Sequence, residues 1–235
     1  MRKAPKILIA APQSDVKNYC FVDWLMNIKK FSYPQDRIEL YLADNSDTKL
    51  NVIRLTEVGI TAKYIPKNGR GIIETMVECH QSCVQYAIDN DFDYILHLET
   101  DVFPPHDVLS KLMIEDKPIA CGLYHILEGA YREPMIRVLE DNNQGYMNAE
   151  SIRDNQGSYI DGQMLDVFSA GLGCALISKD VFSKIKFRFV EGKDQHPDTW
   201  FAMDMKSQDI PISVHTGLVC EHRNGTWGTF NLNFK

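Results

Sequence analysis

The first half of the chain alternates between short apolar segments and longer segments with helical periodicity. Continuous apolar runs at 6–11, 37–43, 61–66 and 92–98 are typical of buried strands. Helical patterns lie between them, at 19–31, 48–59 and 70–88. Since a strand, a helix and a further strand in succession favour parallel pairing, the pattern predicts an α/β fold. We expect a doubly wound, mostly parallel sheet with helices on both faces.

The helix predicted at 70–88 has the clearest apolar stripe. Its apolar pairs recur at intervals of three to four residues, from Ile72 and Ile73 at the start to Ala87 and Ile88 at the end. His80 lies on the same stripe. We therefore predict that His80 is a packed core histidine and does not bind a ligand.

After Pro105 the alternation weakens. The sequence predicts a strand at 117–125, a polar hairpin-like region at 126–167, and a glycine-rich strand or turn leading into a short helix at 168–185. A helix at 198–209, two short strands within 210–222 and a polar tail at 223–235 complete the chain. No composition shift marks a linker, so we expect one domain over 1–235 with a small, mixed C-terminal part.

Charge and composition do not favour a nucleic-acid-binding, membrane-spanning or secreted protein. The formal net charge of −7 and the pI near 5.5 give no basic surface for nucleic acid or for an anionic membrane. The apolar run near the N-terminus is shorter than the roughly 7–15 residues of a signal peptide, and no segment approaches the roughly 18 apolar residues of a membrane span. Scattered cysteines favour buried free thiols and a cytoplasmic protein; they are Cys20, Cys79, Cys83, Cys121, Cys174 and Cys220.

Polar residues follow all four predicted strands of the first half. Pro12 and Gln13 follow the first strand and Asp44 with Asn45 the second. The third strand runs into 68–71, which is Asn-Gly-Arg-Gly, and the fourth into 99–101, which is Glu-Thr-Asp. Open parallel sheets bind ligands at the carboxyl ends of their strands, so these residues are candidates for one binding site.

Glu99 and Asp101 differ from the other acidic residues nearby by their position. Asp89, Asp91 and Asp93 also form acid-x-acid triplets, but they precede the fourth strand, where a solvated turn is expected. Two carboxylates at the ligand-binding edge need a compensating cation, and carboxylate oxygens suit Mg²⁺ or Mn²⁺. A structural ion pair is the alternative.

Arg70 lies between two glycines, Gly69 and Gly71, which allow a close approach of the backbone. Gly69 can supply a positive φ, and Arg70 offers a fork of donors at the start of a helix whose N-terminus can hold an anion. The alternative interpretation is a plain connection between strand and helix.

The ordered series "ILIAAP", "LADNSD", "KNGRGIIETM", "FDYILHLETDVFPPHDVL", "FSAGLGCALISKDVF" and "PDTWFAMDMKSQDIPISVHTGLVCEH" resembles the nucleotide-sugar-dependent glycosyltransferases of GT-A fold, especially family-two-like members. The resemblance covers about 6 to 222. The resemblance depends on the order of these segments along the chain, because each segment alone also occurs in unrelated proteins.

The resemblance implies roles for the acidic residues at the strand ends. Asp101 matches the metal-binding carboxylate of the D-x-D motif, while Glu99 stands in place of the usual first aspartate. Asp44 matches the acid that contacts the base or ribose, and His222 matches the histidine that closes the metal site. The implied metal set is thus Glu99, Asp101 and His222, and the implied donor-binding set is Pro12, Asp44, Asn45, Asn68, Arg70, Glu99, Thr100 and Asp101.

The resemblance also implies a catalytic base near the start of the helix at 198–209. Asp198 stands where inverting members carry an acidic pair, although Pro197 replaces the first acid. Asp204, farther along the same segment, is the competing candidate. With the pair broken, the stereochemical outcome stays open between inversion and retention.

The expected function is a metal-dependent glycosyl transfer, of a hexosyl or related group, from a nucleoside-diphosphate sugar to a hydroxyl acceptor. The resemblance favours a UDP-sugar, with a GDP-sugar as the alternative donor, and a glycan, lipid-linked sugar, protein or modified nucleic acid as acceptor. Residues 1–104 are expected to bind the donor and 105–222 the acceptor. Two other classes stay open: a noncatalytic module that binds nucleotide sugar or glycan, and a sugar-1-phosphate nucleotidyltransferase, although a G-x-G-x-R segment near the first strand is absent.

Overall fold

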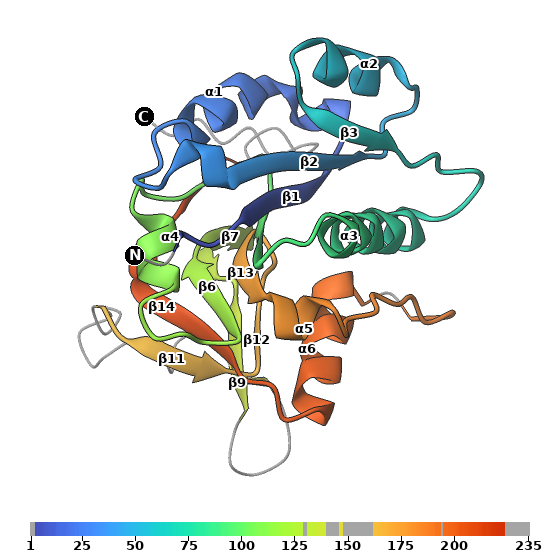
Figure 1. Ribbon diagram of the computed structural model, residues 1–235. Helices are drawn as coiled ribbons and strands as arrows, with labels where there is room; N and C mark the ends of the chain where they lie inside the picture. Colours follow the sequence, from blue (N-terminus) through green and yellow to red (C-terminus); the bar gives the residue numbers. More distant parts are fainter. Residues whose placement is uncertain (1–2, 129–130, 140–145, 148–161, 194, 224–235) are drawn as a thin grey trace.

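The computed structural model describes residues 3–128, 131–139, 146–147, 162–193 and 195–223. A single sheet of eight strands forms its centre, in the order β11-β14-β6-β13-β4-β1-β2-β3 (Figure 1). The first half of the chain supplies four parallel strands, β1 (Ile7–Gln13), β2 (Ile38–Asp44), β3 (Thr61–Tyr64) and β4 (Tyr94–Leu98). The predicted mostly parallel α/β sheet is confirmed.

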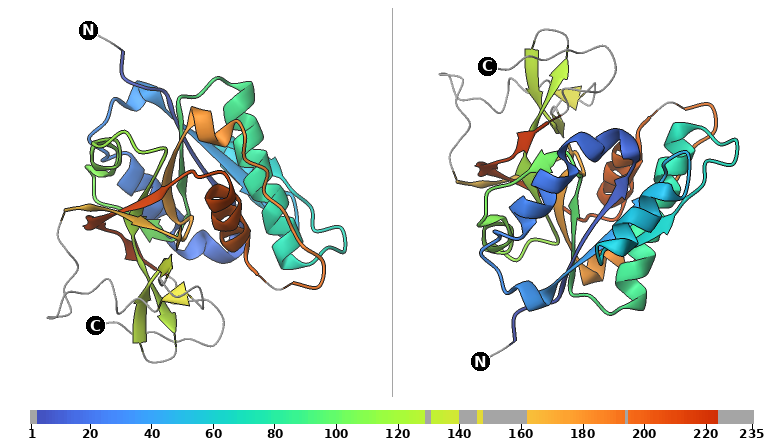
Figure 2. Two further views of the ribbon diagram at one scale, coloured as in Figure 1. Left: turned by 90° about the horizontal axis from the view of Figure 1, so that it is seen from below. Right: turned by 90° about the horizontal axis from the view of Figure 1, so that it is seen from above.

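Helices cover both faces of this sheet, as its continuous apolar strands require (Figures 1 and 2). In β1, Ile7 and Ile9 pack with Trp24 on one face, whereas Leu8 packs with Cys83 on the other. The first face carries α1 (Asn18–Ile28), α2 (Leu50–Glu57) and α4 (Val108–Leu112). The second carries α3 (Ile72–Asp89), α5 (Lys179–Phe182) and α6 (Pro197–Ser207).

The second half of the chain extends the same sheet. Its strands are β6 (Ile119–Leu123), β11 (Met164–Val167), β13 (Cys174–Ser178) and β14 (Ile212–Val219). Strand β13 lies between β4 and β6 and runs antiparallel to both. β4 and β6 follow each other along the chain as strands of the main sheet, but β13 separates them within it.

Short strands surround one end of the main sheet. The hairpin expected after residue 125 is confirmed in β7 (His125–Glu128) and β8 (Tyr131–Pro134), and β9 (Ile136–Leu139) pairs with β10 (Tyr146–Met147) and β12 (Ser169–Ala170). Residues 129–130, 140–145 and 148–161 of the expected hairpin region, and nearly all of the tail, 224–235, lie outside the described residues.

A two-stranded sheet joins the two halves of the chain beside the end of β4. Strand β5 (Val102–Phe103) pairs antiparallel with β15 (Glu221–His222), so that His222 stands opposite Val102. The backbone N–H of Arg223 donates to the Asp101 carbonyl at 2.8 Å. This pairing brings His222 to the Glu99–Asp101 turn.

Two predictions about buried side chains are confirmed. His80 is only 2% exposed and packs inside the core, and all six cysteines are buried free thiols. Within the described ranges, no helix combines the length and the apolar character needed to cross a membrane. The cytoplasmic location stays a prediction.

Candidate functional site

Lys17 lies between the two carboxylates that follow β4. Its Nζ is 2.9 Å from Glu99 Oε2 and 2.9 Å from Asp101 Oδ1. Asp101 is fully buried, and the Lys17 side chain is only 11% exposed. Buried charges are stable only when paired, so this ammonium is the cation that compensates the acidic pair in the structure.

The backbone fixes all three charges at one edge of the sheet. Lys17 closes a single 3-10 turn, Asp15–Lys17, directly after β1. The Glu99 N–H donates to Gly173 O at 3.0 Å, and the Val102 N–H donates to Glu99 O at 3.0 Å. The carboxyl ends of β1 and β4 thus place Lys17, Glu99 and Asp101 within contact distance.

The pKa values reflect this pairing. Burial lowers the pKa of Lys17, but the two carboxylates raise it more, so that the net shift is upward. Burial likewise raises the pKa of Glu99, but Lys17 outweighs it and the pKa falls well below its usual range. Both groups are therefore charged at neutral pH.

Asp101 keeps one oxygen for another partner. Its Oδ2 is buried and has no hydrogen-bond partner among the described residues. The Nε2 of His222 lies 3.7 Å from it, and the Nδ1 of His222 lies 2.9 Å from His125 O. Donation from Nδ1 to that carbonyl leaves Nε2 with a lone pair in the neutral ring, so Asp101 Oδ2 and His222 Nε2 have the chemistry that a divalent cation needs.

The predicted metal set of Glu99, Asp101 and His222 stays a prediction. The described part of the chain holds no group of three His, Cys, Asp or Glu side chains arranged as a metal site. Lys17 takes one oxygen from each carboxylate, and the second oxygen of Asp101 faces His222, so Asp101 and His222 are the two groups best placed to hold an ion. Burial lowers the pKa of His222, but Asp101 raises it by more, so that the net shift is upward. A proton therefore competes with a metal for Nε2.

Hydrogen bonds join the ends of β1, β2 and β4. Thr100 Oγ1 donates to Gln13 Oε1 at 2.6 Å, and the Asn45 N–H donates to Gln13 O at 2.9 Å. Pro12 stands opposite Ala43 in the β1–β2 pairing. Six of the eight predicted donor-binding residues thus lie along one edge: Pro12, Asp44, Asn45, Glu99, Thr100 and Asp101.

Asp44 is wholly buried at the end of β2. Its carboxylate accepts from the Ser46 N–H and the Ser46 hydroxyl, each at 3.1 Å, and from the Asn51 side-chain amide. Burial raises the pKa of Asp44, and these donors counter that shift. In this structure Asp44 therefore orders the loop after β2, and its predicted contact with a base or ribose stays a prediction.

Arg70 lies just before α3 and contacts both that helix and the preceding turn. Residues 67–70 form a turn in which Asn68 and Gly69 both have positive φ, at 49° and 79°, as a tight turn of this type requires. The Arg70 guanidinium pairs with Glu78 of α3 and donates to Pro66 O. The strand end that carries Asn68 and Arg70 shows no contact with Asp101 among the described interactions.

The two candidate bases on α6 have different surroundings. Asp198, in the first turn, accepts a hydrogen bond from His196 Nδ1. Burial and the charge of Glu99 raise the pKa of Asp198, but His196 lowers it more, so that the net shift is downward. Asp204 instead forms two 2.9 Å bonds with the Arg188 guanidinium. Asp198 thus interacts electrostatically with Glu99, whereas Asp204 forms an ion pair with Arg188.

A pair of buried histidines backs the site. His97 Nδ1 lies 2.6 Å from Leu172 O, and His97 Nε2 lies 2.8 Å from His80 Nδ1. If Nδ1 of His97 donates to the carbonyl, its Nε2 must accept the proton of His80. Burial, and to a lesser extent the nearby His97, lowers the pKa of His80 to about 3. Burial also lowers the pKa of His97, so both rings are neutral.

The glycine-rich segment before β13 receives Tyr124. The Tyr124 hydroxyl accepts from the Gly173 N–H at 3.1 Å, and its ring meets the edge of His222 at 5.2 Å between centroids. A Cβ on Gly171 or Gly173 would fall within 3 Å of Tyr124 atoms. These glycines are therefore needed for a close approach that supports His222.

The sequence did not indicate several residues of this site. Lys17 and His196 stand alone in the sequence, without a pattern that marks them, and each reaches the site through tertiary packing. His97 lies within β4, an ordinary strand of otherwise apolar or aromatic residues, and is one of four successive buried residues there. Only the nearness of Lys17 to the end of the first strand could have drawn attention to it.

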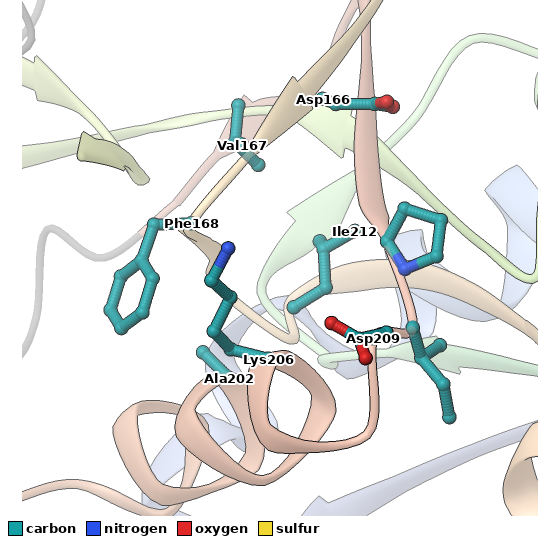
Figure 3. A pocket seen from close by; sticks show the side chains of 9 residues that line it. Asp166, Val167, Phe168, Ala202, Lys206, Asp209 and Ile212 are labelled. Atoms are coloured by element: carbon teal, nitrogen blue, oxygen red, sulfur yellow. The ribbon is translucent and has the colours of Figure 1, made fainter. Parts of the chain in front are cut away.

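A cavity of about 390 Å³ lies elsewhere, between α6 and the start of β14 (Figure 3). Lys206 extends across it toward Val167 and Phe168, and Asp209 stands beside Ile212. Because β14 runs parallel to β6, which runs parallel to β4, the start of β14 lies at the opposite edge from Asp101. The cavity is separate from the acidic site.

Comparisons with known proteins support the fold. The sequence matches no protein family model and no curated protein. Among solved structures, GalNAc-T7 with UDP, GalNAc and Mn²⁺ aligns with a TM-score of 0.63 at 11% identity, over 93% of this chain and 44% of that one. A197 from STIV aligns with a TM-score of 0.50 at 14% identity, over 93% of this chain and 85% of that one. The chain thus spans less than half of GalNAc-T7, and its fold is of GT-A type.

Proposed function

We propose that this protein is a glycosyltransferase that moves a sugar from a nucleoside-diphosphate sugar to a hydroxyl acceptor with the help of a divalent cation. The observation that carries the proposal is the free Oδ2 of Asp101, buried at the carboxyl end of β4 and facing Nε2 of His222. The GT-A fold supports a donor site at this edge, because open α/β sheets bind ligands at the carboxyl ends of their strands.

The leaving nucleoside diphosphate gathers negative charge as the bond to the sugar breaks, and the site must stabilise that charge. Asp101 and His222 would hold Mn²⁺ or Mg²⁺, which acts as a Lewis acid on the diphosphate. Lys17 adds a positive charge at the same edge. The acidic pair alone would repel the donor, so the cations are required.

Asp198 is the base in this proposal. Its pKa is lowered, so it is ionised at neutral pH and can take the proton of an acceptor hydroxyl. The hydrogen bond from His196 orients its carboxylate. Asp204 is less suited, because both of its oxygens already bind Arg188. A base on α6 fits inversion at the anomeric carbon.

The two halves of the chain would divide the substrates. Residues 1–104 would bind the donor, since β1, β2 and β4 supply Gln13, Asn45 and Thr100 to one edge. Residues 105–222 would bind the acceptor beside Asp198 and Tyr124. The GalNAc-T7 structure contains UDP and Mn²⁺, which favours a UDP-sugar as donor here.

The experiment is a thermal-shift screen of nucleoside diphosphates and their sugars, with Mn²⁺ or with EDTA, followed by an assay of nucleoside diphosphate release with a mixture of acceptors. A ligand at one hundred times its Kd stabilises a protein by about 2.7 kcal/mol, which gives a clear shift in Tm. We expect UDP to raise the Tm with Mn²⁺ and much less in EDTA. Equal shifts in both conditions would refute the role of the metal.

Product analysis separates the other two classes of protein. Release of UDP that depends on an acceptor supports transfer. Metal-dependent donor binding without release in any acceptor mixture would identify a binding module instead. Pyrophosphate turnover with a sugar 1-phosphate and a nucleoside triphosphate would identify a nucleotidyltransferase.

A further inference from the structure

Lys17 has the position and the surroundings of a resident cation. Its ammonium contacts one oxygen of Glu99 and one of Asp101 at equal distances of 2.9 Å. The side chain is 11% exposed, so solvent does not compensate these charges. The three groups together carry a net charge of about −1 at neutral pH, against about −2 for the acidic pair alone.

A divalent cation bound by Glu99 Oε2 and Asp101 Oδ1 would need the two oxygens that Lys17 contacts. Mg²⁺ binds oxygen at about 2.0–2.1 Å, so an ion that bridges Glu99 and Asp101 occupies the space that Nζ of Lys17 fills. Even an ion held by Asp101 Oδ2 and His222 Nε2 would share the Asp101 carboxylate with the ammonium. The two positive charges then repel each other across one carboxylate.

The charge of Lys17 lies at the acidic pair, apart from the backbone atoms that anchor the residue. The backbone of Lys17 is anchored by its N–H to Ser14 O at 2.9 Å. Four methylene groups separate that anchor from the charge, and this flexible stem lets the ammonium move while the backbone stays in place. Release of the ammonium therefore requires no rearrangement of β1 or β4.

We propose that Lys17 competes with a divalent cation for Glu99 and Asp101, so that the metal binds weakly alone and tightly together with a nucleoside diphosphate. The proposal deepens the proposed function and rests on its choice of metal site. The diphosphate supplies negative charge that can pair with both the metal ion and the displaced ammonium. Binding of the metal and binding of the nucleoside diphosphate therefore strengthen each other. By thermodynamic linkage, the factor by which UDP tightens Mn²⁺ equals the factor by which Mn²⁺ tightens UDP.

The test compares the wild type with Lys17→Met, which keeps the length and apolar stem of the side chain and removes its charge. Free Mn²⁺ is measured by electron paramagnetic resonance during titration, with and without UDP, so the readout does not depend on activity. Lys30→Met, at an exposed lysine beyond α1, is the matched control. We expect Lys17→Met to bind Mn²⁺ alone at least tenfold tighter and to show a smaller UDP coupling, while Lys30→Met matches the wild type.

The outcomes separate this proposal from the proposed function. If the wild type binds Mn²⁺ with UDP but Lys17→Met gains no affinity for Mn²⁺ alone, competition by Lys17 is refuted and the metal site stands. If no protein binds Mn²⁺ with or without UDP, both proposals fall.

Lys17→Met leaves the carboxylates of Glu99 and Asp101 without their ammonium partner, and the variant could unfold for that reason. A second pair of variants keeps the proposal testable in that case. If circular dichroism shows Lys17→Met to be unfolded, the comparison becomes Glu99→Gln against Glu99→Gln with Lys17→Met. Removal of Lys17 must again tighten Mn²⁺ at least tenfold, and an unchanged affinity overturns the proposal.

Discussion

Nε2 of His222 lies 3.7 Å from Oδ2 of Asp101, the one oxygen of that carboxylate that Lys17 leaves open. The pairing of β5 with β15 produces this distance, because His222 stands opposite Val102, the neighbour of Asp101. The opposite ends of the carboxylate therefore face two different nitrogen groups. One is a charged ammonium, and the other is an imidazole able to bind metal.

Replacement of Asp101 by asparagine tests the carboxylate itself. Asp101→Asn keeps an oxygen that can accept from Lys17 but removes the charge that would hold a cation. We expect UDP release to fall at least about 100-fold, the usual scale for loss of transition-state stabilisation by a charge. The free energy of unfolding without ligand should change by only about 1 kcal/mol.

The matched control for that change is Asp91→Asn. Asp91 precedes β4, pairs with Lys179 on the surface and already has a positive φ of 54°, which asparagine tolerates. Its activity and its Mn²⁺-dependent Tm shift should equal those of the wild type. A global loss of structure in Asp101→Asn, seen by circular dichroism, would instead assign Asp101 a structural role.

Two carboxylates on α6 separate a catalytic role from a structural one. Asp198→Asn should lower kcat at least about 100-fold with little change in donor affinity, because a general base acts only in the chemical step. Asp204→Asn removes the partner of the half-buried Arg188 and should cost about 1 kcal/mol of stability while kcat stays near that of the wild type. Steady-state kinetics and urea unfolding of both variants decide the assignment, and a loss of kcat in Asp204→Asn alone would reverse it.

The parallel part of the fold was predictable because its signals are local. Each apolar run in the first half lies in one strand, and the helices between them carry their own periodicity, as in α3. The place of β13 was not predictable, because an antiparallel strand between β4 and β6 comes from pairing across the chain. Nothing in the sequence of β13 itself specifies its neighbours.

The candidate site was predictable only in part, for the same reason. Asp101 was indicated by its position after a buried strand, and His222 by family resemblance. Lys17 carries no such signal, since a lysine in a short surface turn is expected to be solvated. Its burial depends on Glu99 and Asp101, which reach it only when β1 and β4 pair.

The buried histidine pair predicts how stability depends on pH. The pKa of His80 in the folded protein is about 3, against about 6.5 in the unfolded chain. Between these values the unfolded state binds a proton that the folded state excludes, so stability falls as the pH falls below about 6.5. For His80 alone the loss between pH 7 and pH 5 is about 2 kcal/mol.

Urea unfolding of the wild type and His80→Gln at both pH values measures this contribution. Glutamine does not titrate, and its amide can still donate to His97. The variant should be less stable at pH 7 because the stack of His80 on Phe187 is lost, but its stability should fall less toward pH 5. Parallel pH profiles for the two proteins would show that His80 takes up a proton in the folded state.

The contact between Tyr124 and the glycine-rich segment before β13 gives the last prediction. A Cβ on Gly173 would lie 2.7 Å from Cζ of Tyr124, so Gly173→Ala must push that ring away. Because the same ring meets His222 at 5.2 Å, we expect a loss of about 1–3 kcal/mol of stability together with weaker Mn²⁺ binding in the presence of UDP. Gly71→Ala is the control, since its new Cβ would meet nothing within 4 Å. If Gly173→Ala loses stability but binds Mn²⁺ and UDP as the wild type does, Tyr124 supports the core and has no part in positioning His222.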